Sequence, residues 1–164
     1  MYRIGQSKDI HKLVEGRKLM IGLQEIPFEK GELAHSDGDV LVHAIAEAII
    51  GALGLGDLGK HFSDKDSKYK DMSSEYFLKE VKKMLEKEHY EICNIDSTVI
   101  IEEPMLGKYI EAMKKDISKV LNINLNQINI KATRGEKLGY IGCGDGVEAM
   151  AVVLLKKSNK FINL

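Results

Sequence analysis

The chain has 164 residues, 44% hydrophobic and 30% charged, with a formal net charge of −1. This length fits one catalytic domain over 1–164, and the near-neutral charge excludes a broad polyanion-binding surface, so no nucleic-acid partner is expected. No apolar stretch reaches the about 18 residues of a membrane span. No apolar leader follows Met1, so a cytoplasmic protein is expected. Cys93 and Cys143 are too few and too far apart for a disulfide framework.

The hydrophobic pattern predicts an α/β protein of the α+β type, a mixed sheet with helices packed on one face. The first half should form a strand at 2–11, a hairpin with strands at 18–23 and 26–28, a loop at 29–38, a helix at 39–53 and a glycine-rich loop at 54–59. The second half should form a helix at 73–87, a strand at 90–102, a helix from Pro104 to about 121, and strands at 128–133 and 147–155.

Two side chains suited to a metal lie on the first expected strand. Asp9 and His11 are two residues apart, so both should point to the same face of the sheet. A carboxylate and an imidazole on one face form half of a zinc site. By itself this pattern is common by chance, and it does not decide between a metal site and ordinary polar residues.

The helix expected at 39–53 is apolar on almost every side, which is typical of a buried helix. Its polar side chains, Asp39, His43 and Glu47, are four residues apart and form one stripe. Asp37 or Asp39 can cap its first turn. A buried polar stripe needs internal partners, so it is either a polar seam between helices or subunits, or a metal site.

If the stripe holds a metal, His43 joins Asp9 and His11 as a third ligand. Three protein ligands leave the open fourth position of a catalytic zinc site. Glu47, one turn after His43, would then accept a hydrogen bond from the outer nitrogen of that imidazole.

The segment 33–40, LAHSDGDV, followed by His43, resembles the signature of the 2-C-methyl-D-erythritol 2,4-cyclodiphosphate synthases of non-mevalonate isoprenoid synthesis. The resemblance spans about 2–156 and leaves 157–164 as a C-terminal tail. Further matches in the family's order and spacing are Arg3-Ile4-Gly5, Asp9-x-His11, segments 26–31 and 56–60, Phe62-x-Asp64-x-Asp66, segments 131–133 and 136–140, and Gly142-x-Gly144.

This resemblance implies a homotrimeric, metal-dependent phosphorus–oxygen lyase with active sites at the subunit interfaces. In 4-diphosphocytidyl-2-C-methyl-D-erythritol 2-phosphate, the 2-phosphate attacks the β-phosphorus, and CMP leaves as the cyclic diphosphate forms. It also implies one zinc ion per subunit, held by Asp9, His11 and His43, which polarises the β-phosphate. A Mg²⁺ or Mn²⁺ ion bridges the α- and β-phosphates with Glu136. Such phosphoryl transfer needs positioning and charge neutralisation more than a protein nucleophile.

The remaining matched positions take substrate-binding roles from the same resemblance. His35 and Ser36 would hold the methylerythritol phosphate end, and Asp64 the sugar-alcohol hydroxyls. Asp57 and Gly59 would bind the ribose, although Asp57 also suits the cap of a turn. The cytosine pocket and the diphosphate contact would come from Pro104, Met105, Leu106, Gly107, Ala132 and Thr133, where Thr133 is alternatively only a strand hydroxyl.

The sequence departs from the family pattern at Gln6-Ser7-Lys8, Glu47, Met105, Arg134-Gly135 and Cys143. Glu47 stands where Asp is usual, and Met105 where a Lys commonly follows the proline. We hypothesise that Arg134 supplies phosphate-binding charge that Met105 cannot. Cys143 replaces an Arg that faces an axial cavity in some relatives, so no isoprenoid diphosphate should bind there; tight geranyl diphosphate binding in calorimetry would contradict this.

Two other functions stay open on the sequence. One is a divergent metal-dependent phosphohydrolase or phosphotransferase that acts on a cytidine diphosphate-linked substrate. The other is a zinc-bound trimeric binding protein without turnover, which the presence of all three zinc-ligand matches and of Glu136 argues against.

Overall fold

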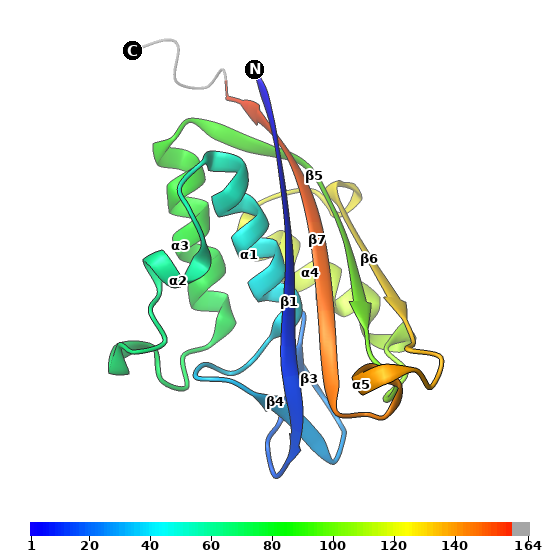
Figure 1. Ribbon diagram of the computed structural model, residues 1–164. Helices are drawn as coiled ribbons and strands as arrows, with labels where there is room; N and C mark the ends of the chain where they lie inside the picture. Colours follow the sequence, from blue (N-terminus) through cyan, green and yellow to red (C-terminus); the bar gives the residue numbers. More distant parts are fainter. Residues whose placement is uncertain (159–164) are drawn as a thin grey trace.

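A computed structural model describes residues 1–158, and a five-stranded mixed sheet is its centre (Figure 1). The strand order is β4-β1-β7-β5-β6, in which β5 and β6 are parallel and every other neighbouring pair is antiparallel. The strands of this sheet are β1 (Tyr2–Glu15), β4 (Lys30–Leu33), β5 (Tyr90–Ile100), β6 (Ile128–Thr133) and β7 (Gly146–Lys157); β2 (Leu19–Ile21) and β3 (Gln24–Ile26) form a separate hairpin.

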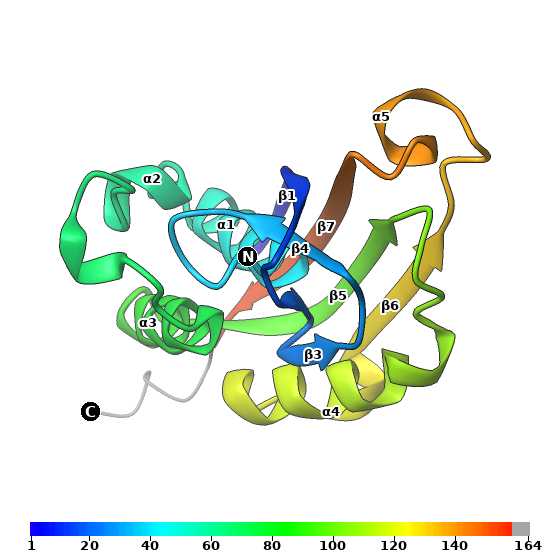
Figure 2. The same cartoon turned by 90° about the horizontal axis from the view of Figure 1, so that it is seen from below.

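The longer helices cover one face of the sheet, which confirms the predicted fold class (Figure 2). Helix α1 lies against β1 and β7, α3 packs beside α1 and against β5, and α4 contacts α3 and β6. The helices are α1 (Val40–Leu53), α2 (Leu58–His61), α3 (Ser74–Lys87), α4 (Ile110–Leu121) and α5 (Gly139–Gly142), with 3₁₀ turns η1 (Ser67–Tyr69), η2 (Gly107–Tyr109) and η3 (Leu125–Gln127). None of the helices within 1–158 combines the length and apolarity that crossing a membrane requires.

Helix α1 is the buried centre of the fold, as its sequence predicts. Its apolar residues from Val40 to Ile50 are fully buried, and so is its N-cap residue, Asp39. The Asp39 carboxylate accepts hydrogen bonds from the backbone N–H groups of Val42, Gly22 and Leu23. The cap therefore satisfies a donor of the first turn and ties α1 to the β2–β3 hairpin.

Within residues 1–158, no helix covers the opposite face of the sheet, and period-two alternation exposes several apolar side chains there beside polar ones such as Gln6 and Lys8. On β1, Ile4 is 72% exposed and Ile10 49%, whereas Gly5 and Ser7 between them are buried against α1. On β7, Met150 and Val152 are exposed and the residues on either side of each are buried. Exposed apolar side chains thus occur on two neighbouring strands of the same face.

Three details of the predicted elements are wrong. The segment expected as a loop at 29–38 contains strand β4, which pairs with the far end of β1, so β1 runs on to Glu15. Pro104 does not begin a helix: it follows a cis peptide bond, and α4 begins at Ile110. The short helix α2 begins within the loop expected at 54–59, and α5 lies in a stretch for which no element was predicted. Of the expected tail at 157–164, residues 159–164 lie outside the described residues.

Candidate metal centre and substrate cavity

Strand β1 and helix α1 bring three candidate ligands together. Asp9 and His11 point from the same face of β1 toward α1, where His43 lies on the facing turn. Asp9 Oδ2 is 3.2 Å from His11 Nε2 and 3.3 Å from His43 Nδ1. The two imidazole rings meet edge to face, with centroids 5.3 Å apart. The ligand atoms of all three residues lie within 4.8 Å of one another.

These separations fit a tetrahedral ion. Neighbouring ligands around zinc are about 3.3 Å apart when the bonds are about 2.0–2.1 Å long. The Asp9–His11 and Asp9–His43 distances match that edge without any movement of the side chains. One carboxylate and two imidazoles are also a donor set that zinc accepts. The three residues therefore fit a divalent transition metal, and they leave one coordination position for another ligand.

On the side of each imidazole ring that faces away from Asp9, hydrogen-bonding groups determine which ring nitrogen faces the candidate metal position. His11 Nδ1 lies 2.5 Å from Glu32 Oε2 and 2.7 Å from the Gly38 carbonyl oxygen. His43 Nε2 lies 3.2 Å from both Ser36 Oγ and Ser74 Oγ. Because the Gly38 carbonyl oxygen can only accept, a proton on Nδ1 of His11 stays on that side, and Nε2 is the nitrogen that faces Asp9.

The sequence analysis missed Glu32 and Ser74. Glu32 lies on β4, which was expected to be a loop, and Ser74 begins α3, 31 residues after His43. Ser74 also donates a short hydrogen bond to Asp37, whose other oxygen accepts from the Ser74 N–H at 2.8 Å. The only signal in the sequence was a Glu between Gly31 and Leu33 in an otherwise small or apolar stretch.

Without a metal, the pKa values of three ionisable side chains at the site are strongly shifted. Burial lowers the pKa of His11, but hydrogen bonds to Asp9 and Glu32 outweigh it and raise this pKa to about 10. Burial raises the pKa of Asp9, yet the two imidazoles hold it well below its usual range. Burial raises the pKa of Glu32 to about 8 although His11 opposes the shift.

Glu47 does not have the predicted role beside His43. Its carboxylate accepts a short hydrogen bond from Ser7 Oγ and another from the Leu58 N–H at 3.2 Å. One helical turn carries Glu47 past the imidazole and toward β1 and α2, while Ser36 and Ser74 take the outer nitrogen of His43. The predicted Glu47–His43 contact is wrong, and Glu47 instead fixes the start of α2 against β1.

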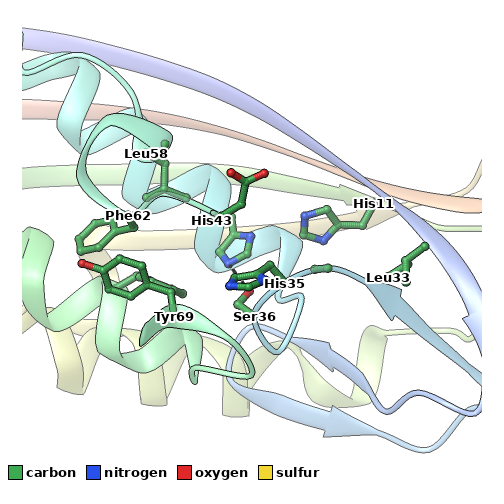
Figure 3. Close-up of a pocket in the computed structure, with 12 residues that line it drawn as sticks. His11, Leu33, His35, Ser36, His43, Leu58, Phe62 and Tyr69 are labelled. Carbon is green, nitrogen blue, oxygen red and sulfur yellow. Dashed lines mark hydrogen bonds between the residues drawn. The ribbon is translucent and has the colours of Figure 1, made fainter. Parts of the chain in front are cut away.

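A cavity of about 400 Å³ opens beside the two histidines (Figure 3). His43 lies between His11 and the pair Phe62 and Tyr69, so one end of the cavity is polar and the other is aromatic. The lining residues are His11, Leu33, Ala34, His35, Ser36, His43, Leu58, Gly59, Phe62, Asp64, Tyr69 and Phe77. The structure therefore gathers four of the predicted substrate residues, His35, Ser36, Gly59 and Asp64, around the metal ligands.

Apart from Gly59, the residues predicted for the nucleotide do not line this cavity. Pro104, Met105 and Gly107 line a separate hollow of about 500 Å³ together with Pro27, Lys108 and Tyr109. Leu106 is buried in the core instead. Ala132 and Thr133 are exposed at the end of β6, and Glu136 is exposed in the loop that follows. Asp57 is exposed and caps α2, accepting a hydrogen bond from the Lys60 N–H at 2.8 Å.

Arg134 is held by acidic neighbours. Its guanidinium donates to Glu102 at 3.2 Å and to Glu103 at 3.3 Å. Glu102 also accepts from the Gly135 N–H at 3.0 Å. The charge of Arg134 is therefore directed to the two carboxylates that precede Pro104, and none of these residues lines the cavity at the histidines.

Comparisons with known proteins agree with this geometry. The family model described as the YgbB family matches residues 2–156. The 2-C-methyl-D-erythritol 2,4-cyclodiphosphate synthase of Geobacillus sp. (strain WCH70) is 52% identical over 157 residues, 96% of this chain and 99% of that one.

Solved structures share the fold over the same span. The bifunctional IspDF from Campylobacter jejuni matches with a TM-score of 0.92 and 38% identity, and the match covers 96% of this chain and 42% of that longer one. IspF from Plasmodium falciparum, solved as a CDP complex, matches with a TM-score of 0.85 and 37% identity over 96% of this chain and 97% of that one.

Proposed function

This chain belongs to the YgbB family, and from that membership we propose that it forms 2-C-methyl-D-erythritol 2,4-cyclodiphosphate, the product for which its relatives are named. The substrate is 4-diphosphocytidyl-2-C-methyl-D-erythritol 2-phosphate, and CMP leaves as its 2-phosphate attacks the β-phosphorus. A relative solved with CDP supports a cytidine diphosphate-linked ligand. The observation that carries the proposal is the convergence of Asp9, His11 and His43, of which the two histidines line a cavity.

Asp9 Oδ2, His11 Nε2 and His43 Nδ1 would hold a zinc ion, because the two separations from Asp9 match an edge of its tetrahedron and all three ligand atoms lie within 4.8 Å of one another. Bound zinc supplies positive charge to a phosphoryl oxygen that takes the fourth position. Glu32 and Gly38 keep His11 in the required tautomer, and Ser36 and Ser74 do the same for His43.

The polar and aromatic ends of the cavity bind different parts of the substrate. His35 and Ser36 hold the methylerythritol phosphate end, and Asp64 accepts hydrogen bonds from the sugar-alcohol hydroxyls. The aromatic end, formed by Phe62, Tyr69 and Phe77, suits the carbon skeleton and keeps water away from the reacting phosphates. A phosphate held at the histidines and a fixed carbon chain together bring the 2-phosphate into line with the β-phosphorus.

Most of the residues expected at the cytidine end lie apart from the cavity in a single chain, and Gly59, which lines the cavity, is the exception. Pro104 to Gly107 and Ala132 would form the cytosine pocket, with Asp57 and Gly59 on the ribose. Thr133 would donate to the diphosphate, and Glu136 would hold Mg²⁺ or Mn²⁺ against it. Because the hollow at Pro104 is separate from the cavity at His43, the two sets complete one site when they come from neighbouring copies.

The uncovered sheet face supports a homotrimer for the same reason. Ile4, Ile10, Met150 and Val152 expose an apolar surface on the face away from the helices. Obligate interfaces between copies are apolar in this way. Packing of these faces around a common axis would remove that surface from water and bring the β6 end of one copy toward the β1 edge of the next.

Phosphorus NMR of the reaction tests the proposed function. The purified protein is incubated with the proposed substrate, Zn²⁺ and Mg²⁺, and we expect the cyclic diphosphate and CMP in equal amounts. The variant His43→Ala should lose product and zinc together. The variant His89→Asn is the matched control, because His89 lies in the turn after α3 and its φ of 57° suits Asn.

Two other outcomes would replace the proposal. CMP without the cyclic product would identify a phosphohydrolase on a cytidine diphosphate-linked substrate. Zinc binding without any conversion would identify a non-catalytic binding protein.

A further inference from the structure

Glu32 is a buried carboxylate that the proposed reaction does not use directly. Its side chain on β4 has no exposed surface. Oε2 lies 2.5 Å from His11 Nδ1 and accepts from the Val40 N–H at 3.1 Å. Oε1 has no hydrogen-bond partner within the described part of the chain. A buried carboxylate with one unsatisfied oxygen is costly, so a role in folding alone does not explain it.

The first turn of α1 does not need this carboxylate. Asp39 already caps the helix through the Val42 N–H, and the single bond from Val40 to Glu32 needs only a neutral acceptor. The Nδ1 proton of His11 also has a neutral acceptor, the Gly38 carbonyl oxygen at 2.7 Å. What Glu32 adds beyond these groups is a carboxyl group in direct contact with the outer nitrogen of one candidate metal ligand.

Within residues 1–158, no carboxyl group contacts the outer nitrogen of the second histidine directly. His43 Nε2 faces the hydroxyls of Ser36 and Ser74, both at 3.2 Å, and Asp37 reaches it only through Ser74. The two imidazoles are therefore unequal: His11 is held by a carboxyl group at short distance and His43 by two hydroxyls at longer distance. A carboxylate hydrogen-bonded to the outer nitrogen makes the inner nitrogen of an imidazole more basic and fixes the orientation of the ring.

We propose that Glu32 is a positioning residue for the metal, which forms a carboxylate–histidine pair with His11 and sets the affinity of the site for zinc. Glu32 touches neither the cavity nor the expected path of the substrate, so it acts through His11. The inference rests on the metal site of the proposed function, and it does not depend on which phosphate ester is converted. It also assigns β4 a role: this strand carries the carboxylate to the back of β1.

Zinc affinity tests the proposal without any substrate. The variants Glu32→Gln and Glu32→Leu are titrated with Zn²⁺ against a chromophoric chelator, next to the wild-type chain. Glu32→Leu should bind zinc about 10–100-fold more weakly, the usual effect of removing such a partner. Glu32→Gln should fall between the two, because its amide oxygen still accepts the Nδ1 proton. The control Glu29→Gln, exposed just before β4, should bind as the wild type does.

Two further readouts separate positioning from a structural role. The metal-free Glu32→Gln chain should melt close to the wild type, because its amide oxygen still accepts from the Val40 N–H and from Nδ1 of His11. In nitrogen-15 NMR of the zinc-loaded proteins, the Nδ1 proton of His11 should move upfield in Glu32→Leu as its strong hydrogen bond is lost. A structural role predicts instead a lower melting temperature without metal.

Each outcome decides between specific statements. Zinc binding by Glu32→Leu within twofold of the wild type would overturn the positioning role and leave the proposed function untouched. A wild-type chain that binds zinc tightly but forms no cyclic diphosphate would overturn the proposed function and leave the role of Glu32 standing. A wild-type chain that binds no zinc would overturn both.

Discussion

The distance between β1 and α1 decides both the stability of the fold and the geometry of the metal site, and Gly5 sets it. A Cβ atom at Gly5 would lie 1.9 Å from the carbonyl oxygen of Ala48, 2.7 Å from the backbone nitrogen of Ala52 and 2.8 Å from its Cβ. These atoms belong to the buried helix α1, so no flexible side chain can move aside. In the variant Gly5→Ala, the strand and the helix must separate.

Overpacking of a buried contact costs about 1–3 kcal/mol, and a clash with backbone at this distance belongs at the upper end. For a chain of this size, about 2–3 kcal/mol corresponds to a melting temperature about 4–12 °C lower. Because β1 carries Asp9 and His11 while α1 carries His43, the same separation should also weaken zinc binding. Thermal unfolding followed by circular dichroism, without metal, measures the first effect.

Gly51→Ala is the matched control on the same helix. A Cβ at Gly51 meets nothing within 4 Å, so the substitution should stabilise α1 by about 0.5–1 kcal/mol and raise the melting temperature. Opposite shifts of the two variants support the reasoning. A Gly5→Ala chain that melts at or above the wild-type temperature would refute it, because the packing of β1 on α1 would then tolerate a methyl group.

Two further predictions concern charge. His11 has a pKa of about 10 in the metal-free fold against 6.5 when unfolded, so its stabilising contribution is complete below pH 6.5 and disappears as the pH rises toward 10. The melting temperature of chelator-stripped protein should therefore fall across this pH window. In His11→Asn, the melting temperature should depend less on pH. Arg134→Thr should raise KM strongly at unchanged zinc affinity, because Glu102 and Glu103 would then face the anionic nucleotide without their cation; an unchanged KM would reject this role.

The elements that carry the candidate metal ligands could be predicted from the sequence alone. The period of two on β1 places Asp9 and His11 on one face, and the almost wholly apolar pattern of α1 predicts a buried helix whose polar stripe includes His43. These patterns depend only on local sequence, so they can be recognised without knowing which elements pack against them. The family signature added the expected roles, and the structure brings the three ligands together.

The groups that contact the outer nitrogens of His11 and His43 could be identified only in the folded structure. Strand β4 exists because it pairs with the far end of β1, a long-range contact that a short, charged and glycine-containing segment does not announce. That pairing carries Glu32 to His11, and the docking of α3 carries Ser74 to His43. The sequence suggested Glu47 because it is one turn from His43, but helix geometry directs it to Ser7 and Leu58. The hydrogen-bond partners of a metal-binding imidazole depend on how distant elements pack. Any nearby acceptor can satisfy an imidazole N–H, and the tertiary structure determines which acceptor lies close enough.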